Sequence, residues 1–263
     1  MFRLVADRAL INRMGFNNDG SLAVAARLAS REAVFKTVVG VNIGKTKVVP
    51  EAEAVADYVK SAERLAPYAD YLVVNVSSPN TPACATSRRW TTCARCSAPC
   101  ARPPTAPSPG RVPLLVKIAP DLADEDIDAV ADLAVELGLD GIIATNTTIA
   151  REGLGLRSAP ALVAETGGLS GAPLKARSLE VLRRLYARVG DRITLVGVGG
   201  IETAEDAWQR ILAGATLVQG YSAFIYEGPF WCRSIHKGLA ARLRTSPYAT
   251  LADAVGADVR KPA

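Results

Sequence analysis

The chain of 263 residues has a single histidine, His236. A hydrolase of the Ser-His-Asp type would have only this imidazole to use, and its place in an amphipathic helical pattern is typical of a surface residue. Clusters of histidines and carboxylates with metal-ligand spacing are also lacking. We therefore expect neither a serine hydrolase nor a metal site built from these residue types.

Long apolar runs are missing as well. No stretch approaches the roughly 18 consecutive apolar residues of a membrane-spanning helix, and the first residues lack the charged-then-apolar order of a signal peptide. The composition, 49% hydrophobic and 22% charged, is that of an ordinary soluble chain. We expect one domain over residues 1–263 and a cytoplasmic location for this chain.

Residues 83–111 contain no lysine, aspartate or glutamate, but they contain five arginines. The whole chain has 31 basic and 26 acidic residues, so without these five arginines 26 residues of each sign remain. The net charge of +5 thus belongs to one local segment. It does not indicate a nucleic-acid-binding face, and we predict no nucleic-acid partner.

Outside that segment, short apolar runs alternate with longer stretches of helical period, a pattern typical of βαβ units. The predicted strands are residues 38–43, 71–76, 114–118, 141–145, 194–198 and 215–219. The predicted helices are residues 51–66, 124–137, 178–189, 203–213 and 229–243. Asp124 and Thr203 are candidate N-caps for two of these helices.

Every predicted strand ends in polar or glycine residues, namely Asn42, Asn75, Lys117, Thr145-Asn146, Gly199-Gly200 and Tyr221-Ser222. Each of these could serve only a turn, but six in succession favour a functional rim, because barrel enzymes keep their active sites at the carboxyl ends of their strands. An open doubly wound sheet is the alternative. It is disfavoured because no Gly-x-Gly-x-x-Gly follows a first strand.

Residues 75–82, Asn-Val-Ser-Ser-Pro-Asn-Thr-Pro, place two amides and two serine hydroxyls after a predicted strand. An asparagine side chain both donates and accepts hydrogen bonds, so several asparagines around one pocket suit a planar ligand with alternating donors and acceptors, such as a pyrimidine dione. The asparagines that could form such a ring are Asn12, Asn75, Asn80 and Asn146. The glycines at 199–200 and residues 221–222 follow the last two strands, where barrels often bind phosphate.

Eight sequence blocks together resemble the signature blocks of class 2 dihydroorotate dehydrogenases, in the order and approximate spacing of that family. The blocks are residues 12–18, 42–45, 75–82, 117–121, 144–148, 166–171, 197–201 and 218–221. The resemblance covers about residues 1–82 and 112–245. It implies a (β/α)₈ TIM barrel that binds FMN, oxidises (S)-dihydroorotate to orotate in pyrimidine (UMP) synthesis, and passes the electrons to a quinone.

The resemblance also implies roles for individual residues. Ser78 would be the base that removes a proton from C5 of dihydroorotate while a hydride passes from C6 to the flavin; class 1 enzymes use cysteine there. A serine in this role needs a dry pocket and hydrogen bonds that take up its proton, whereas its purely structural role would be a loop hydroxyl bonded to its own backbone. Lys117 would stabilise the negative charge of the reduced flavin, against the alternative of a solvated lysine at the rim.

Further contacts follow from the same resemblance. The implied FMN contacts are Asn42, Asn75, Lys117, Thr145, Gly171, Gly200, Tyr221 and Ser222. The implied substrate contacts are Asn12, Arg13, Met14, Gly15, Phe16, Asn75, Asn80, Asn146 and Thr147.

In the family, further segments precede the region that matches Met1. They include the helices that associate peripherally with the cytoplasmic face of the membrane, and also the first two β/α units. We therefore expect an incomplete barrel, and an inactive remnant is one alternative to the working enzyme. Another FMN- or phosphate-binding barrel oxidoreductase is the second.

The segment 83–111 departs from the family and is expected to be disordered. Cys84, Cys93, Cys96 and Cys100 could form a zinc or iron–sulfur knuckle. A frameshift accounts for the segment better. If one base was lost after Pro82, the middle base of each original codon is now read as a first base, and a middle T encodes an apolar residue. Codons that now begin with T therefore mark lost apolar residues at 84, 87, 90, 93, 96 and 97, which is helical spacing. The interpretation requires a second, compensating shift before Val112, and the coding DNA would test it.

Overall fold

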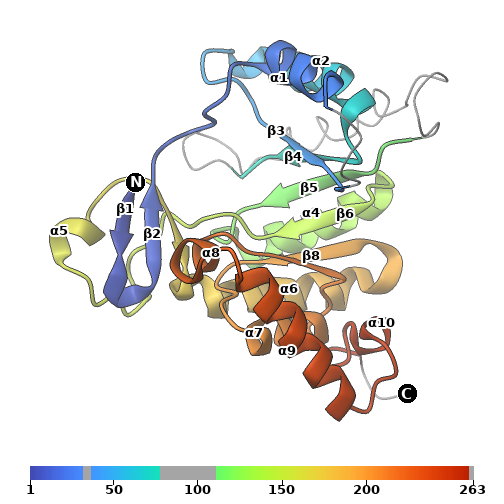
Figure 1. Cartoon of the computed structure of the whole chain (residues 1–263). Helices are drawn as coiled ribbons and strands as arrows, with labels where there is room; N and C mark the ends of the chain where they lie inside the picture. The colour runs from blue at the N-terminus through green and yellow to red at the C-terminus, as the bar shows by residue number, and fades with distance from the viewer. Residues whose placement is uncertain (32–36, 78–110, 261–263) are drawn as a thin grey trace.

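Six parallel strands form the main sheet of the computed structural model, which describes residues 1–31, 37–77 and 111–260 (Figure 1). In sheet order they are β3 (Gly40–Ile43), β4 (Tyr71–Asn75), β5 (Leu114–Ile118), β6 (Gly141–Ala144), β8 (Thr194–Val198) and β9 (Leu217–Gln219). These are the six strands predicted from the sequence. Each pairs in parallel with the next, so all their carboxyl ends lie at one edge of a curved sheet. The predicted α/β barrel type of fold is confirmed.

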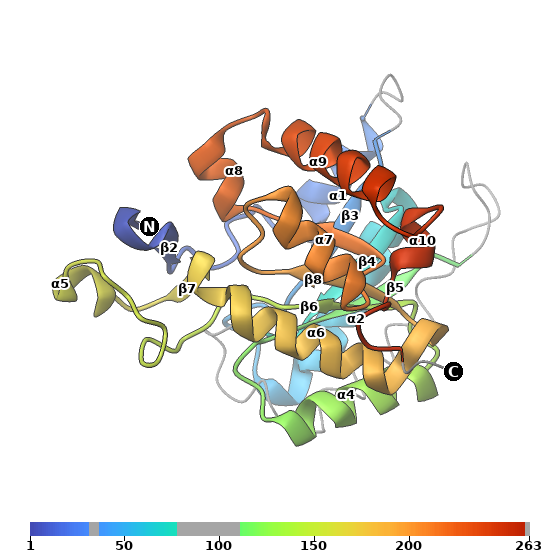
Figure 2. The ribbon, with the colours of Figure 1, turned by 90° about the horizontal axis from the view of Figure 1, so that it is seen from below.

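Helices cover the outer face of this sheet. They are α1 (Ser21–Ala29), α2 (Ala54–Leu65), α4 (Asp124–Glu136), α6 (Lys175–Val189) and α7 (Ala204–Leu212), and α9 (Trp231–Thr245) packs on α7. Shorter helices are α5 (Pro160–Val163), α8 (Ser222–Glu227) and α10 (Leu251–Ala254). Seen from below, α4 and α6 lie side by side (Figure 2), joined by the Arg184–Asp128 ion pair at 2.7 Å.

Side chains alternate between the two faces of the main sheet, as the period of a strand requires. Leu72 and Val116, for example, are fully buried in the core cluster that includes Ile127 of α4 and Leu182 of α6. The side chains at the alternate positions of these strands point to the concave face of the sheet. There Val73, Leu115, Ile143 and Val196 form a second cluster. The sheet is thus apolar on both sides, which is why its strands are continuous apolar runs in the sequence.

A second, antiparallel sheet contains β1 (Phe2–Leu4), β2 (Ala9–Asn12) and β7 (Gly168–Gly171). β7 belongs to the segment between β6 and α6, so this sheet is attached at the carboxyl edge of the main sheet (Figure 1). The sequence analysis did not predict these strands. They place the N-terminal residues beside the ends of the barrel strands.

The ends of two helices test the predicted caps. Thr203 caps α7 as predicted: its hydroxyl accepts from the Asp206 N–H at 3.2 Å, and the Asp206 carboxylate accepts from the Thr203 N–H at 2.9 Å. The prediction for Asp124 was wrong, because Ala123 occupies the N-cap position of α4. Asp124 is the first helical residue, where a negative charge is also favourable, and its carboxylate forms ion pairs with Arg177 and Arg184.

Several sequence-based predictions concern residues outside the described ranges. Ser78, Asn80 and the four cysteines of the possible metal knuckle belong to this group, together with nearly all of the segment 83–111. Within the described ranges, no three His, Cys, Asp or Glu side chains are arranged to hold a metal ion. In the same ranges no helix combines the length and the apolar character needed to cross a bilayer.

Candidate active site

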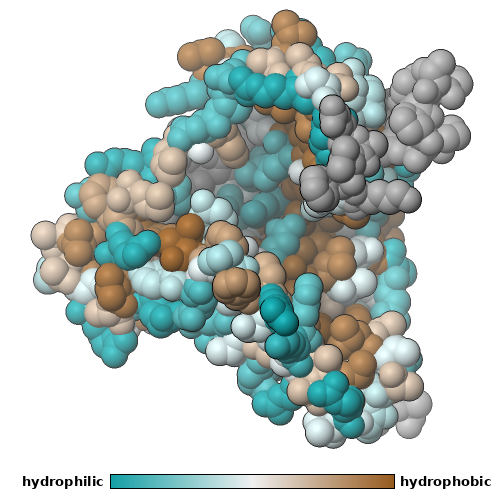
Figure 3. Space-filling model, viewed as in Figure 1, coloured by the Kyte–Doolittle hydropathy of each residue, from teal (hydrophilic) through white to brown (hydrophobic). Residues whose placement is uncertain are grey.

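A pocket opens at the carboxyl edge of the main sheet, between the strand ends and the second sheet. The space-filling view shows a hollow near the middle of this face, with hydrophilic residues in its depth (Figure 3). The pocket is lined by Arg8 and Asn12, Lys117, residues 145–147, Ser170, Gly171 and Leu174, residues 198–202, and residues 220–223. Strand ends that are distant in the sequence therefore meet around one cavity, as the predicted functional rim requires.

Lys117 is the cation in the floor of this pocket. It belongs to the concave face, where it lies opposite Asn75 of β4 and Ile143 of β6 in the strand registers. Its ammonium forms no hydrogen bond or ion pair with any described residue, and burial lowers the pKa of Lys117 below its ordinary value. Lys117 is partly buried, and an ammonium withdrawn from water is costly without an anion beside it, so this position fits a ligand that carries or develops negative charge.

Three polar residues form a linked group at the ends of β4 and β6. The Asn75 side-chain oxygen Oδ1 accepts from the Ser77 backbone N–H at 3.0 Å and from the Ser77 hydroxyl at 2.7 Å. The Asn146 amide Nδ2 donates to the Ser77 carbonyl at 3.2 Å and to the Ser77 hydroxyl at 2.9 Å. Asn75 and Ser77 are buried, and the Tyr58 hydroxyl donates to the Asn75 carbonyl at 3.0 Å. Both amides are therefore held in fixed orientations.

A glycine turn follows β8 and forms the opposite wall. Gly199 and Gly200 both have positive φ, 116° and 68°. A Cβ on Gly200 would lie 2.7 Å from the backbone N and Cα of Lys175, so only glycine fits between this turn and the start of α6. Backbone N–H groups without neighbouring side chains suit an anion such as phosphate.

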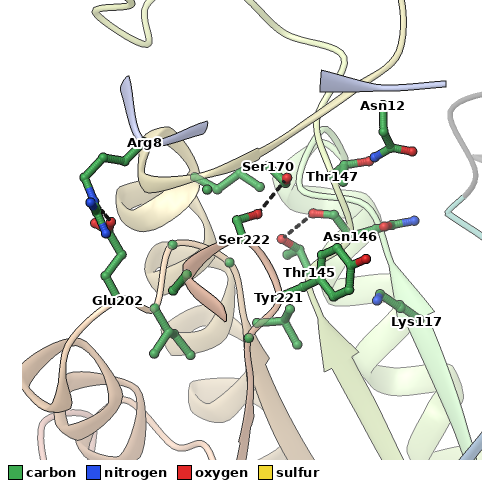
Figure 4. Close-up of a pocket in the computed structure, with 18 residues that line it drawn as sticks. Arg8, Asn12, Lys117, Thr145, Asn146, Thr147, Ser170, Glu202, Tyr221 and Ser222 are labelled. Carbon is green, nitrogen blue, oxygen red and sulfur yellow. Dashed lines mark hydrogen bonds and ion pairs between the residues drawn. The ribbon is translucent and has the colours of Figure 1, made fainter. Parts of the chain in front are cut away.

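Two hydroxyl groups join the turn after β9 to the second sheet. The Ser222 hydroxyl donates to that of Ser170 at 2.8 Å, a contact drawn in Figure 4. Ser222 and Thr145 are buried, whereas Tyr221 is 68% exposed at the mouth of the pocket. Gly171, which is in β7, has a φ of 102° and lies against the backbone of Arg8 and Ala9.

An ion-pair network borders the pocket on the far side from Lys117 (Figure 4). Arg8 pairs with Glu202 and Glu227, and Glu202 also contacts the ammonium of Lys175 at 3.4 Å. The Arg8 guanidinium lies 5.1 Å from the centre of the Tyr226 ring, whose hydroxyl donates to the Ala9 carbonyl at 3.0 Å. These contacts fix the β1–β2 hairpin to the turn after β8 and to α8.

The pocket contains many, but not all, of the residues predicted from the sequence. Its lining includes Asn12, Lys117, Thr145, Asn146, Thr147, Gly171, Gly200, Tyr221 and Ser222. Asn75 lies beside Lys117 through the strand register, and Asn42 is exposed on β3, opposite Val73. Arg13, Met14, Gly15 and Phe16 are not in the pocket lining: Arg13 pairs with Glu165 at 2.6 Å, and Met14 and Phe16 are about half exposed. Their predicted role remains a prediction.

The sequence analysis missed Arg8, Ser77, Ser170 and Glu202 as site residues. Ser77 and Ser170 lie inside blocks that the family resemblance covers, so proximity to those blocks was a usable signal. No sequence signal pointed to Arg8 or Glu202, because these residues come into contact only through the pairing of β2 with β7, which the sequence does not reveal.

A parallel barrel-type sheet with a partly buried lysine, oriented amides and a glycine turn at its carboxyl edge is the arrangement of an α/β-barrel enzyme. The family model of dihydroorotate dehydrogenase matches residues 1–243. The chain belongs to the dihydroorotate dehydrogenase family.

Individual relatives agree with this assignment. A dihydroorotate dehydrogenase (quinone) of Streptomyces coelicolor is 84% identical over 267 residues, which cover 99% of this chain and 71% of the relative. The enzyme of the same name from Thermobifida fusca is 62% identical, covering 98% and 69% of the two chains. The crystal structure of ligand-free DHODH from Eimeria tenella superposes with a TM-score of 0.91 at 39% identity, covering 99% of this chain and 77% of that one.

Proposed function

We propose that the chain oxidises (S)-dihydroorotate to orotate in pyrimidine synthesis, with FMN as its flavin and a quinone as the electron acceptor. The observation that carries the proposal is the partly buried Lys117, which has no hydrogen bond or ion pair with the described residues and lines the same cavity as Asn146 and the Gly199-Gly200 turn. The relatives named dihydroorotate dehydrogenase (quinone) support the choice of substrate and acceptor.

The residues present fit FMN. The Gly199-Gly200 turn has no room for a Cβ at Gly200 and lines the pocket with backbone, which suits a phosphate, while Lys117 offers a positive charge in the same pocket. Bound FMN would supply the acceptor of two electrons. Lys117 would then stabilise the negative charge that develops on the flavin's pyrimidine edge, and burial strengthens this interaction by excluding water.

The remaining residue roles are part of the proposal. Ser78 would take the proton from C5 of dihydroorotate. The substrate contacts would be Asn12, Asn75, Asn80, Asn146 and Thr147, together with residues 13–16. Asn42, Thr145, Gly171, Tyr221 and Ser222 would contact FMN within a single barrel domain. A quinone is dissolved in the bilayer, so we further propose peripheral association with the cytoplasmic face of the membrane.

Anaerobic reduction of the flavin tests the function. Purified protein reconstituted with FMN should lose its oxidised flavin absorbance when dihydroorotate is added, and a quinone should restore it. Flavin binding without reduction by dihydroorotate would indicate another barrel oxidoreductase. Failure to bind FMN would indicate an inactive chain. The variant Ser78→Ala should bind orotate but reduce the flavin much more slowly, by about 10²-fold or more for loss of a general base.

A further inference from the structure

Arg210 of α7 is a fully buried arginine directly behind the Gly199-Gly200 turn. It is 1% exposed, and its Nη2 donates to the carbonyls of Gly199 at 2.7 Å and Lys175 at 2.8 Å and to the Ser178 hydroxyl at 2.8 Å. All three acceptors are neutral, and the Nε has no hydrogen-bond partner among the described residues. Buried arginines normally bind a carboxylate, so this arrangement needs a separate explanation.

The charge of Arg210 is only partly compensated. Burial lowers the pKa of Arg210 to about 10, so the guanidinium is still protonated at neutral pH. Asp206, one turn earlier in α7, acts on it only through space. The Asp206 carboxylate is already bonded to the Lys175 ammonium at 2.9 Å and to the Glu202 and Thr203 backbone N–H groups. An anion on the other side of the turn would supply the missing negative charge.

The contact with Gly199 also has a directional effect. The C=O and N–H of one trans peptide unit point in opposite directions. Since the Gly199 carbonyl points to Arg210, the N–H of Gly200 in the same peptide points away from it, on the side of the turn that faces the pocket. Arg210 holds the Lys175 carbonyl at the same time, which fixes the start of α6 against this turn.

We propose that Arg210 is a positioning residue for the flavin phosphate: it orients the Gly200 N–H toward the phosphate and supplies a buried positive charge behind the turn. The inference rests on the proposed FMN function and goes beyond it, because it assigns phosphate selectivity to a residue that does not line the pocket. It predicts that Arg210 discriminates between FMN and riboflavin, which differ only by the phosphate.

Flavin binding to the cofactor-free protein tests the proposal without any measurement of activity. Dissociation constants for FMN and riboflavin would be measured by fluorescence for the wild type, Arg210→Met and Arg210→Lys. We expect Arg210→Met to weaken FMN binding by about 10- to 100-fold, the range for lost charged hydrogen bonds, and to leave riboflavin binding nearly unchanged. Arg210→Lys keeps the charge and should recover part of the selectivity.

Arg188→Met is the matched control, because Arg188 pairs with Asp132 on the surface of α6 and should affect neither flavin. Equal losses of FMN and riboflavin in Arg210→Met, or selectivity unchanged in both Arg210 variants, would overturn the proposal. If Arg210→Met does not fold, the FMN-to-riboflavin ratio of Arg210→Lys decides, and a ratio equal to that of the wild type would overturn it. A wild-type protein that binds neither flavin would overturn the proposed function as well.

Discussion

Ser77 donates its backbone N–H to the Asn75 side chain, and this contact determines which end of the Asn75 amide is free. A backbone N–H only donates, so the atom facing it at 3.0 Å is the oxygen of Asn75, and the NH₂ remains for a ligand. The Ser77 carbonyl only accepts, so Asn146 faces it with its NH₂ and keeps its oxygen for a ligand. A ring edge with a carbonyl beside an N–H, as in a pyrimidine dione, satisfies both amides.

Exchange of either amide for a carboxylate tests this polarity. Asn75→Asp keeps the oxygen that faces Ser77 but replaces the free donor by an acceptor, so orotate binding should weaken by about 10- to 100-fold. Asn146→Asp adds the same charge and keeps the free acceptor, so it should weaken orotate binding less. Titration of the flavin spectrum with orotate measures both.

A pyrimidine with the reversed edge, 6-carboxycytosine, provides the control for this prediction. It carries an amine and an unprotonated ring nitrogen in place of the carbonyl and N–H, so the wild type should reject it and Asn75→Asp should bind it better than the wild type does. Equal effects of the two carboxylate substitutions on both ligands would contradict the assigned polarity.

Replacement of Lys117 should separate stability from function. Because burial lowers the pKa of Lys117, the unfolded chain binds this proton more tightly than the folded chain, and the cost of burying the charge is fully present below the folded pKa. Lys117→Met should therefore raise the melting temperature of the cofactor-free protein, by about 2–4 °C per kcal/mol regained. The flavin should become harder to reduce, by about 30 mV for each tenfold loss of relative affinity for its reduced form.

The pH dependence of folding stability tests whether the buried charge of Lys117 destabilises the protein. Between the lowered folded pKa and the ordinary value of 10.5, the unfolded chain holds more protons, so stability from this group rises as the pH increases. The melting temperature of Lys117→Met minus that of the wild type should thus be largest below the folded pKa and shrink as the pH rises toward 10.5. A difference that grows with pH would show that Lys117 is not held at a cost.

Gly200→Ala should destabilise the protein by more than its backbone strain alone would cause. Its φ of +68° disfavours a side chain by about 1–2 kcal/mol, and the added Cβ would also meet the Lys175 backbone at 2.7 Å. Gly153→Ala is the matched control, with a φ of +71° and open space around the Cβ. Chemical denaturation should show the larger loss for Gly200→Ala, and only this variant should lose FMN binding. Similar flavin affinities in the two variants would argue against the turn as a phosphate site.

Arg8→Gln should loosen the β1–β2 hairpin with little change in global stability. The ion pairs of Arg8 with Glu202 and Glu227 are partly exposed, and such pairs contribute about 1 kcal/mol or less. Hydrogen exchange of residues 2–12 should therefore become faster while the melting temperature changes little. Arg3→Gln is the control, since Arg3 also lies over Tyr226, at 5.3 Å. Unchanged hydrogen exchange in Arg8→Gln would show that the Tyr226–Ala9 hydrogen bond is sufficient to hold the β1–β2 hairpin in place.

The main sheet was predictable because both of its faces are buried, which makes each strand a continuous apolar run in the sequence. The second sheet was not, because β1, β2 and β7 have only three or four residues and Leu10 pairs with Ser170, which is far away in the chain. Arg210 was missed for a related reason. An arginine in an amphipathic helix is normally exposed, and only the packing of α7 against the turn after β8 buries it.

The chain leaves the main sheet after β6 and returns at β8, while β6 and β8 pair directly with each other from Gly141↔Thr194 to Ala144↔Gly197. Between them, the part from Thr147 to Gly171 carries Thr147, Ser170 and Gly171 to the pocket and pairs with β2, not with a strand of the main sheet, whereas the later part forms α6 and packs on that sheet. Insertions or exchanges within residues 147–171 would leave the hydrogen bonds of the main sheet intact. Evolution, or an engineer, could thus reshape the choice of ligand in this enzyme at little risk to its architecture.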